Sequence, residues 1–378
     1  MSRSLQGLVT AFCVALLLFV ACAGGELDAN PMIPTSASFV AGAAGSPSAA
    51  AGKSGSAGIA GKVGSAGQGG AGKTGTGGTG GFPVTNYCSY DSGQESQCDG
   101  LQKGYGPVKY SGGRVMTQPI NVYHVWYGDW EGNTAPEILE HLIKNFGESK
   151  YHEINTTYYQ ELAHRHDGNI KTESSREYVS SKVTFVTNVY IGYPYGTSLT
   201  DKNIRDLIFN MIDSGVLPKD ENSTFFVLTS KDVESLFIQG YPYEFCGDFC
   251  GWHYFAKKDD VTIKYAFIGD PDRCPDACGT RNASKKMGIN NSPNNNWAAD
   301  DMASVLVHEL SEMVTDPEIN AWRDDSSYET SDKCAWIFGS TYCTASGARA
   351  NVKFGARDFL VQENWVNDSK CLHCAMKL

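Results

Sequence analysis

The chain lacks an excess of basic residues, which argues against nucleic acid as a partner. Its 31 Lys and Arg stand against 42 Asp and Glu, so the formal net charge is −11 and the pI is near 5.2. Proteins that bind nucleic acid usually carry a basic patch or stripe, often interleaved with aromatic residues. The sequence has no such stripe, and we expect no nucleic-acid partner.

The apolar run at the start of the chain is too short to predict a membrane span. Leu8–Val20 follows a charged start at Met1–Arg3, which is typical of a secretory signal. The run ends in Phe19-Val20-Ala21-Cys22, which is similar to a lipobox, although Phe19 is not the preferred residue there. We predict a signal peptide over residues 1–22 and a membrane contact only through a lipid on Cys22. Ordinary cleavage near Ala23, releasing a soluble protein, is the alternative.

Residues 23–80 have almost no aromatic side chains. They consist largely of Ala, Gly, Ser and Lys, and such a composition cannot bury enough apolar area to offset the entropy lost on ordering. We expect a flexible linker here. Residues 81–378 are rich in aromatic residues and predict one globular domain, exposed at the cell surface, on the outer membrane, or secreted.

Cysteine is abundant, and ten cysteines lie beyond the predicted signal. An even number in an exported chain predicts disulfides, although the pairing cannot be read from sequence. The C-x3-C and C-x2-C spacings would also suit zinc, which we consider the weaker interpretation in an oxidising compartment. The ten are Cys88, Cys98, Cys246, Cys250, Cys274, Cys278, Cys334, Cys343, Cys371 and Cys374.

The pattern of apolar residues predicts an α/β fold of the α+β kind. Period-two or continuous apolar runs predict strands, and apolar residues three or four apart predict helices. The strands are expected at 120–127, 183–191, 223–229, 251–255, 264–269 and 357–365, and the helices at 135–146, weakly at 155–163, at 201–214 and at 300–316. This order matches the N-terminal lobe of a zincin, so we expect a zincin-like mixed sheet with packed helices, held by disulfides.

The stretch 300–317, DDMASVLVHELSEMVTDP, organises the chain. Asp300 or Asp301 is expected to cap the helix, and Pro317 is expected to end it. Val305, Leu306, Leu310, Met313 and Val314 give the apolar spacing of a helix that is mostly buried.

Three polar residues interrupt this apolar pattern. His308 and Glu312 are four apart, so they lie on one helix face and can bind one metal ion. Glu309 is the candidate general base that activates water, as in the HExxH helix of zinc proteases. Here the second His is replaced by Glu312, giving HExxE, and zinc accepts carboxylate oxygen. The alternative is a buried network in which His308 and Glu312 bind each other and the backbone.

A third ligand is expected after the helix. Glu329 lies 17 residues after Glu312 and Asp332 lies 20 after it, and either could complete a site for Zn²⁺ or another divalent cation. The alternative for both is a solvated turn beside Cys334. For His253 we favour a core histidine with a satisfied ring over one that faces the site and binds a substrate oxyanion.

Several segments in one order resemble the EXORDIUM or phosphate-induced protein family, known from plant cell walls. They are INVYHVWYGDW at 120–130, FFVLTSKDV at 225–233, FCGDFCGWHYF at 245–255, YAFIGDPDRCPDAC at 265–278, SVLVHELSEMVTDPEINAW at 304–322 and RDFLVQENW at 357–365. Glu329, Asp332 and Cys334 fall on the family's Glu-Ile-Ala-Asp-x-Cys segment. The lipobox, the Gly-rich linker and the stretch Ala335–Ala350 with Cys343 depart from the family pattern.

The resemblance implies an extracellular location and a fold more than a reaction, so two functions stay open. The first is a zincin-like metal-dependent hydrolase, acting on an extracellular peptide through Glu309, with the metal on His308, Glu312 and Glu329 or Asp332. The second is a non-catalytic protein that binds matrix or polysaccharide, with a structural or vestigial metal site. A closed site with no cleft would favour the second.

Overall fold

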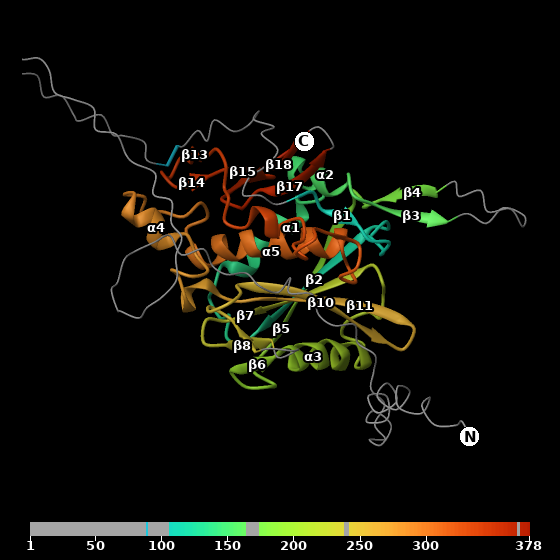
Figure 1. The fold of residues 1–378 in the computed structure, drawn as a ribbon. Coiled ribbons are helices and arrows are strands. Elements are labelled where there is room, and N and C mark those ends of the chain that lie inside the picture. Colours follow the sequence, from blue (N-terminus) through green and yellow to red (C-terminus); the bar gives the residue numbers. More distant parts are fainter. Residues whose placement is uncertain (1–87, 90–105, 164–173, 238–241, 369–370) are drawn as a thin grey trace, which may run out of the picture. The chain divides into compact units, whose positions relative to one another are not determined.

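A five-stranded mixed sheet forms the centre of the computed structural model, which describes residues 88–89, 106–163, 174–237, 242–368 and 371–378 (Figure 1). Four strands are parallel neighbours, and the fifth pairs antiparallel at one edge. In spatial order the strands are β10 (Gly251–Lys258), β11 (Val261–Ile268), β7 (Ser223–Thr229), β2 (Ile120–Tyr127) and β5 (Val183–Ile191).

The hydrophobic content of the strands explains their places in the sheet. Every residue of β7 is buried, as expected for a central parallel strand with both faces covered. At the edge, β10 and β11 form a hairpin through the two-residue turn Asp259–Asp260, with Asp259 at a φ of 53°. In this hairpin His253 lies opposite Ala266. It is one of the first four residues of β10, all of which are buried.

Helices lie on both sides of the sheet (Figure 1). On one side α5 contacts β10 and β11, and α1 contacts both β5 and α5; α3 contacts β11 and the small sheet that contains β6. The helices are α1 (Ala135–Lys144), α2 (Lys150–Asn155), α3 (Asp201–Asp213), α4 (Arg281–Lys286) and α5 (Trp297–Thr315), with short 3₁₀ turns at Pro271–Arg273 and Asp332–Cys334.

Short strand pairs surround this core. One three-stranded sheet contains β6 (Ser198–Thr200), β8 (Glu234–Phe237) and β9 (Tyr243–Glu244). The two-stranded sheets are β1 (Lys109–Tyr110) with β12 (Trp322–Arg323), β3 (Tyr159–Ala163) with β4 (Ser174–Tyr178), β13 (Tyr342–Cys343) with β14 (Arg349–Ala350), β15 (Val352–Phe354) with β16 (Arg357–Phe359), and β17 (Asn364–Asp368) with β18 (Cys371–Ala375).

The helix α5 is buried along almost its whole length, as its apolar spacing predicts. Its N-cap is Asn296, whose side chain accepts the Ala299 N–H, so the predicted cap at Asp300 or Asp301 is wrong. The helix starts earlier because Asn296 offers the same short acceptor ahead of Trp297. It ends at Thr315, and Asp316 before Pro317 leaves the helical region, as predicted.

Two other sequence predictions need correction. Residues 155–163 are not helical beyond Asn155, because Tyr159–Ala163 pairs with β4 and the Tyr159 ring packs against Trp322. The predicted strand at 357–365 is two strands, β16 and the start of β17, each with its own partner. The overall mixed α/β class is confirmed.

Four disulfides join described residues, which confirms the disulfide prediction over cysteine-bound zinc for these pairs. They are Cys88–Cys343, Cys246–Cys274, Cys250–Cys278 and Cys334–Cys374. The predicted signal peptide, the lipobox at Cys22 and the 23–80 linker lie outside the described residues. No helix among the described residues has the length and apolar character needed to cross a membrane.

Candidate metal centre

The helix α5 holds His308, Glu309 and Glu312 in the protein interior. Each of these residues is only 1% exposed. His308 and Glu312 share a helix face as predicted, with His308 Nε2 lying 3.2 Å from Glu312 Oε1. Two buried carboxylates on neighbouring turns are costly unless cations or donors surround them.

The segment after β12 brings both predicted third ligands to this helix. His308 Nε2 lies 3.7 Å from Asp332 Oδ1, and the Asp332 backbone N–H donates to Glu312 Oε1 over 2.9 Å. Glu329 is fully buried, and its backbone N–H donates to Asp332 Oδ2 over 3.0 Å. Neither residue lies in a solvated turn. The Cys334–Cys374 disulfide fixes the end of this segment.

The strand β10 adds His253, which we expected to be a core histidine outside the site. The ring is buried as predicted, but the prediction that it is satisfied is wrong, because Nε2 has no hydrogen bond among the described residues. Nδ1 donates to Glu309 Oε2 over 3.3 Å, and Nε2 lies 3.6 Å from Glu329 Oε1. His253 therefore faces the acidic cluster through both ring nitrogens.

A glycine allows the strand and the helix to approach each other at this point. A Cβ on Gly251 would lie 2.6 Å from Val305 Cγ1 and 2.9 Å from Glu309 Oε1, closer than packed atoms can come. The Gly-Trp-His run at 251–253 therefore carries the sequence signal for this site: a residue without a side chain two positions before a histidine on an edge strand.

The donors form two groups of three that share Glu312. One consists of His253, Glu312 and Glu329, and the other of His308, Glu312 and Asp332; within each, the donor atoms lie within 4.8 Å of one another. Zinc with four ligands at 2.0–2.1 Å places its donors about 3.4 Å apart. The nitrogen-to-oxygen separations of 3.2, 3.6 and 3.7 Å in the cluster fit a cation of this size.

Burial shifts the pKa of four groups here, His253, Glu309, Glu312 and Glu329, in the direction that disfavours charge. It raises the pKa of Glu309 to about 8, and it also raises the pKa of Glu312 and Glu329. It lowers the pKa of His253 to about 4. Both carboxylate oxygens of Glu329 and Oε1 of Glu309 have no hydrogen-bond donor among the described residues. The protein side chains alone do not satisfy this cluster.

A glutamine orients the ring of His308. The Gln362 side-chain amide contacts His308 Nδ1, and the Gln362 backbone N–H is held by Ser304 Oγ over 3.0 Å. With the amide oxygen turned to the ring, Nδ1 donates a proton to it and Nε2 is left as an acceptor toward Glu312. Such a partner fixes both tautomer and direction of a metal-binding histidine.

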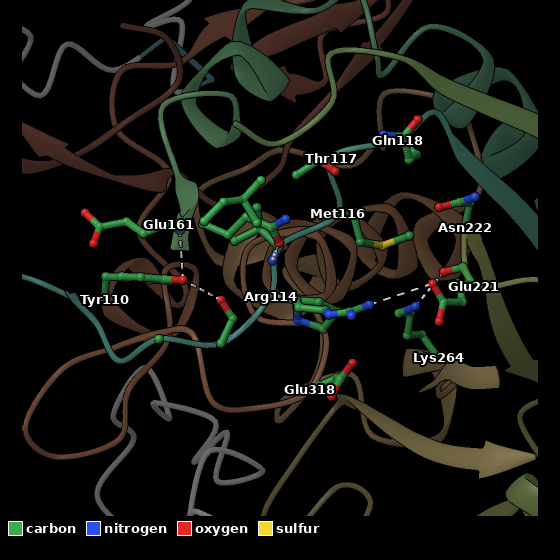
Figure 2. Close-up of a pocket in the computed structure, with 16 residues that line it drawn as sticks. Tyr110, Arg114, Met116, Thr117, Gln118, Glu161, Glu221, Asn222, Lys264 and Glu318 are labelled. Atoms are coloured by element: carbon green, nitrogen blue, oxygen red, sulfur yellow. Dashed lines mark hydrogen bonds and ion pairs between the residues drawn. The ribbon is translucent and has the colours of Figure 1, made fainter. Parts of the chain in front are cut away.

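A separate pocket of about 410 Å³ lies near the end of α5 (Figure 2). No side chain of the cluster lines it. Lys264 is buried in its wall, and this burial lowers the pKa of its ammonium group. Arg114 Nη1 lies 3.9 Å from Glu221 Oε2 across the pocket. The remaining polar lining residues include Tyr110, Gln118, Glu161, Asn222 and Glu318.

Comparisons with known proteins agree with the segments that carry the sequence resemblance. Residues 108–370 match the family described as the phosphate-induced protein 1 conserved region. Two Arabidopsis thaliana proteins, EXORDIUM-like 3 and EXORDIUM-like 5, are each 29% identical over 68% of this chain, covering 80% and 75% of their own lengths. No solved structure matches. The chain belongs to the phosphate-induced protein family, together with these EXORDIUM-like proteins.

Proposed function

We propose that this chain is an exported EXORDIUM-like protein whose core holds a divalent cation, with zinc the leading candidate, in a closed structural site. The observation that carries the proposal is the burial of the donors: their side chains are 0–3% exposed. Structural metal sites are closed by protein, whereas catalytic sites keep a position open to substrate. The cation would cross-link β10, α5 and the segment at 329–332.

The role of Glu309 follows from its contact with His253. Because Glu309 Oε2 accepts the Nδ1–H, it leaves Nε2 turned toward Glu329 and available to a cation. A carboxylate behind a metal-binding histidine commonly sets its orientation. In the closed site Glu309 is therefore a positioning residue.

Such a protein would bind its ligand in the surface pocket near the end of α5, away from the cation. Hydrogen-bond donors such as Arg114 and Lys264 line this pocket together with acceptors such as Glu161 and Glu221, and Asn222 offers both (Figure 2). A sugar hydroxyl both donates and accepts, so this lining suits an extracellular polysaccharide. Export, whether by secretion or on a lipid at Cys22, fits the disulfides of the described domain.

One oxygen atom of Glu309 favours a second function, metal-dependent hydrolysis. Glu309 Oε1 is buried, has no hydrogen-bond donor among the described residues, and belongs to the HExxE pattern on α5. In a zincin-like metallohydrolase this oxygen would take the proton of the attacking water, and the cation would supply Lewis-acid polarisation of a peptide carbonyl. The side chains of the cluster are only 0–3% exposed in the described part of the chain, which disfavours access by a peptide, so we rank this function second.

The test is the metal content of the purified full chain, measured by elemental analysis. We expect near-stoichiometric zinc or another divalent cation in the wild type, and a loss in His308→Ala. Glu309→Gln then separates the two functions. If the site is structural, Glu309→Gln should bind the cation more weakly than the wild type, and neither protein should hydrolyse peptides. A hydrolase predicts unchanged metal content, with peptide hydrolysis by the wild type that the variant lacks. A folded wild type that contains no metal would contradict both functions.

A further inference from the structure

We infer that the cluster binds two divalent cations, bridged by the carboxylate of Glu312. The inference rests on the proposed cation site and extends it. A single site needs one third ligand from the segment 329–332. The structure supplies two, Glu329 and Asp332, and pairs each with a different histidine.

The two oxygens of Glu312 face different histidines. Oε1 lies 3.2 Å from His308 Nε2, whereas Oε2 lies on the side of the His253 ring, 3.6 Å from Nδ1, and the donor atoms of His253, Glu312 and Glu329 lie within 4.8 Å of one another. Each side also has its own carboxylate: Asp332 Oδ1 is 3.7 Å from His308 Nε2, and Glu329 Oε1 is 3.6 Å from His253 Nε2. A carboxylate with one oxygen on each side is the usual bridge in two-metal sites.

Hydrogen bonding argues that one cation leaves the cluster incomplete. Asp332 accepts a backbone N–H from Glu329, and Glu312 accepts one from Asp332. Glu329 is fully buried, and neither of its oxygens has a donor among the described residues. A cation held by His308, Glu312 and Asp332 alone would leave the Glu329 carboxylate unsatisfied, at a cost of several kcal/mol. A second cation at His253 removes this cost.

The number of carboxylates in the cluster also indicates two cations. Five carboxylates gather here: Glu309, Glu312, Asp316, Glu329 and Asp332. Arg323 Nε lies 3.4 Å from Asp316 Oδ2 and balances one of them. The nearby Lys333 is held by Asp324 over 2.9 Å, so these two balance each other. Four carboxylates are left, and when all four are ionised as ligands their charge is balanced by two divalent cations and not by one.

The donor set narrows the choice of ions. Each position offers one imidazole nitrogen and two carboxylate oxygens, with no sulfur. Zinc and other first-row divalent ions suit such a nitrogen and oxygen set, whereas Ca²⁺ prefers oxygen alone and a higher ligand number.

The test is a titration of the metal-free full chain with Zn²⁺, read as bound zinc per chain after removal of free ion. We expect two in the wild type, one in His253→Ala, one in His308→Ala and none in Glu312→Ala. His141→Ala, a histidine outside the cluster that contacts the Phe354 carbonyl, is the control and should keep two.

The outcomes separate this inference from the proposed function. One zinc per wild-type chain, lost in His308→Ala, keeps the cation site and overturns the bridged pair. No zinc in the folded wild type overturns both. Two zinc ions that survive in Glu312→Ala would place them elsewhere and contradict the bridge. If His253→Ala does not fold, Glu329→Gln replaces it, and we again expect one zinc per chain. The count of zinc ions in the wild type tests the inference without any variant.

Discussion

His253 Nε2 lies 3.6 Å from Glu329 Oε1, although 76 positions separate them in the chain. Glu329 has no hydrogen-bond donor in the described part of the chain, and His253 comes from an edge strand of the central sheet. The contact therefore joins the sheet to the segment after β12 through two groups that satisfy each other poorly. Such a pair is stable only when a cation lies between its members or when the carboxylate is neutral.

Replacing Glu329 should have opposite effects with and without metal. In metal-free protein at pH 8, Glu329→Gln removes a buried carboxyl group that has no hydrogen-bond donor among the described residues and whose pKa burial raises, so we expect the free energy of unfolding to rise by about 1 kcal/mol or more. With zinc present, the same variant loses a ligand and should be less stable than wild type. Urea unfolding with EDTA and with zinc measures both. The exposed Glu148→Gln is the control and should change neither value.

Removal of metal should destabilise the wild type. A ligand that binds only the folded chain, present at about a thousand times its Kd, adds about 4 kcal/mol to the free energy of unfolding. For a domain of this size that corresponds to a fall in Tm of about 10 °C on adding EDTA. Thermal unfolding followed by circular dichroism would measure it. An unchanged Tm after metal removal is verified would contradict the structural role.

Gln362 should control metal affinity without being a ligand. Its side-chain amide contacts His308 Nδ1, and loss of such an orienting partner typically weakens metal binding 10- to 100-fold. We expect Gln362→Ala to raise the zinc Kd by this factor while the number of zinc ions per chain stays unchanged. Competition with a chelator of known affinity measures it. An unaltered Kd would show that Gln362 does not orient the ring.

The Cys334–Cys374 disulfide should stabilise the segment that carries the two acidic ligands. Cys334 follows Asp332 by two residues, and the bond closes a separation of 40 residues, which is worth about 4 kcal/mol in the chain-entropy account. The double variant Cys334→Ser, Cys374→Ser should lose about this stability and bind zinc more weakly. The matched control is the pair Cys246→Ser, Cys274→Ser, since that disulfide joins segments outside the cluster. It should lose stability and keep the wild-type zinc Kd.

His152 should make the protein less stable in mild acid. Burial lowers its pKa from 6.5 to about 4, while Nε2 donates to the Ser180 carbonyl over 2.9 Å. Because the unfolded chain binds the proton more readily, its contribution is present above pH 6.5 and is lost as the pH falls to about 4, by about 3 kcal/mol. Urea unfolding with EDTA at pH 4.5, 5.5 and 6.5 compares wild type with His152→Gln. The stability difference between them should shrink as the pH falls, and a constant difference would refute the assignment.

The local patterns in the sequence were sufficient to locate the main elements. The strands at 120–127, 183–191 and 223–229 are found where their β-branched and aromatic runs predict them, and α5 ends before Pro317 as expected. The i, i+4 spacing was also sufficient to bring His308 beside Glu312. These features depend on neighbours in the chain, and the periodicity of apolar residues reports such neighbours directly.

The remaining part of the candidate site depends on contacts between distant segments. The choice between Glu329 and Asp332 could not be made from their spacing, because the structure brings both to the cluster. His253 was predicted to have a satisfied ring, since nothing local shows that its strand packs against the HExxE helix. Gly251 on β10 packs closely against Glu309 on α5, and this contact between distant segments, which brings His253 to the site, is visible only in the fold.

The central claim is a cation centre built from imidazole and carboxylate, and X-ray absorption at the zinc edge of the zinc-loaded full chain tests it most directly. We predict a first shell of nitrogen and oxygen at about 2.0–2.2 Å, with no sulfur at about 2.3 Å. We also predict a zinc–zinc contribution at about 3.5–4 Å that disappears in His253→Ala, which should keep one zinc ion. A sulfur shell, or a zinc–zinc contribution that is the same in wild type and His253→Ala, would contradict the account.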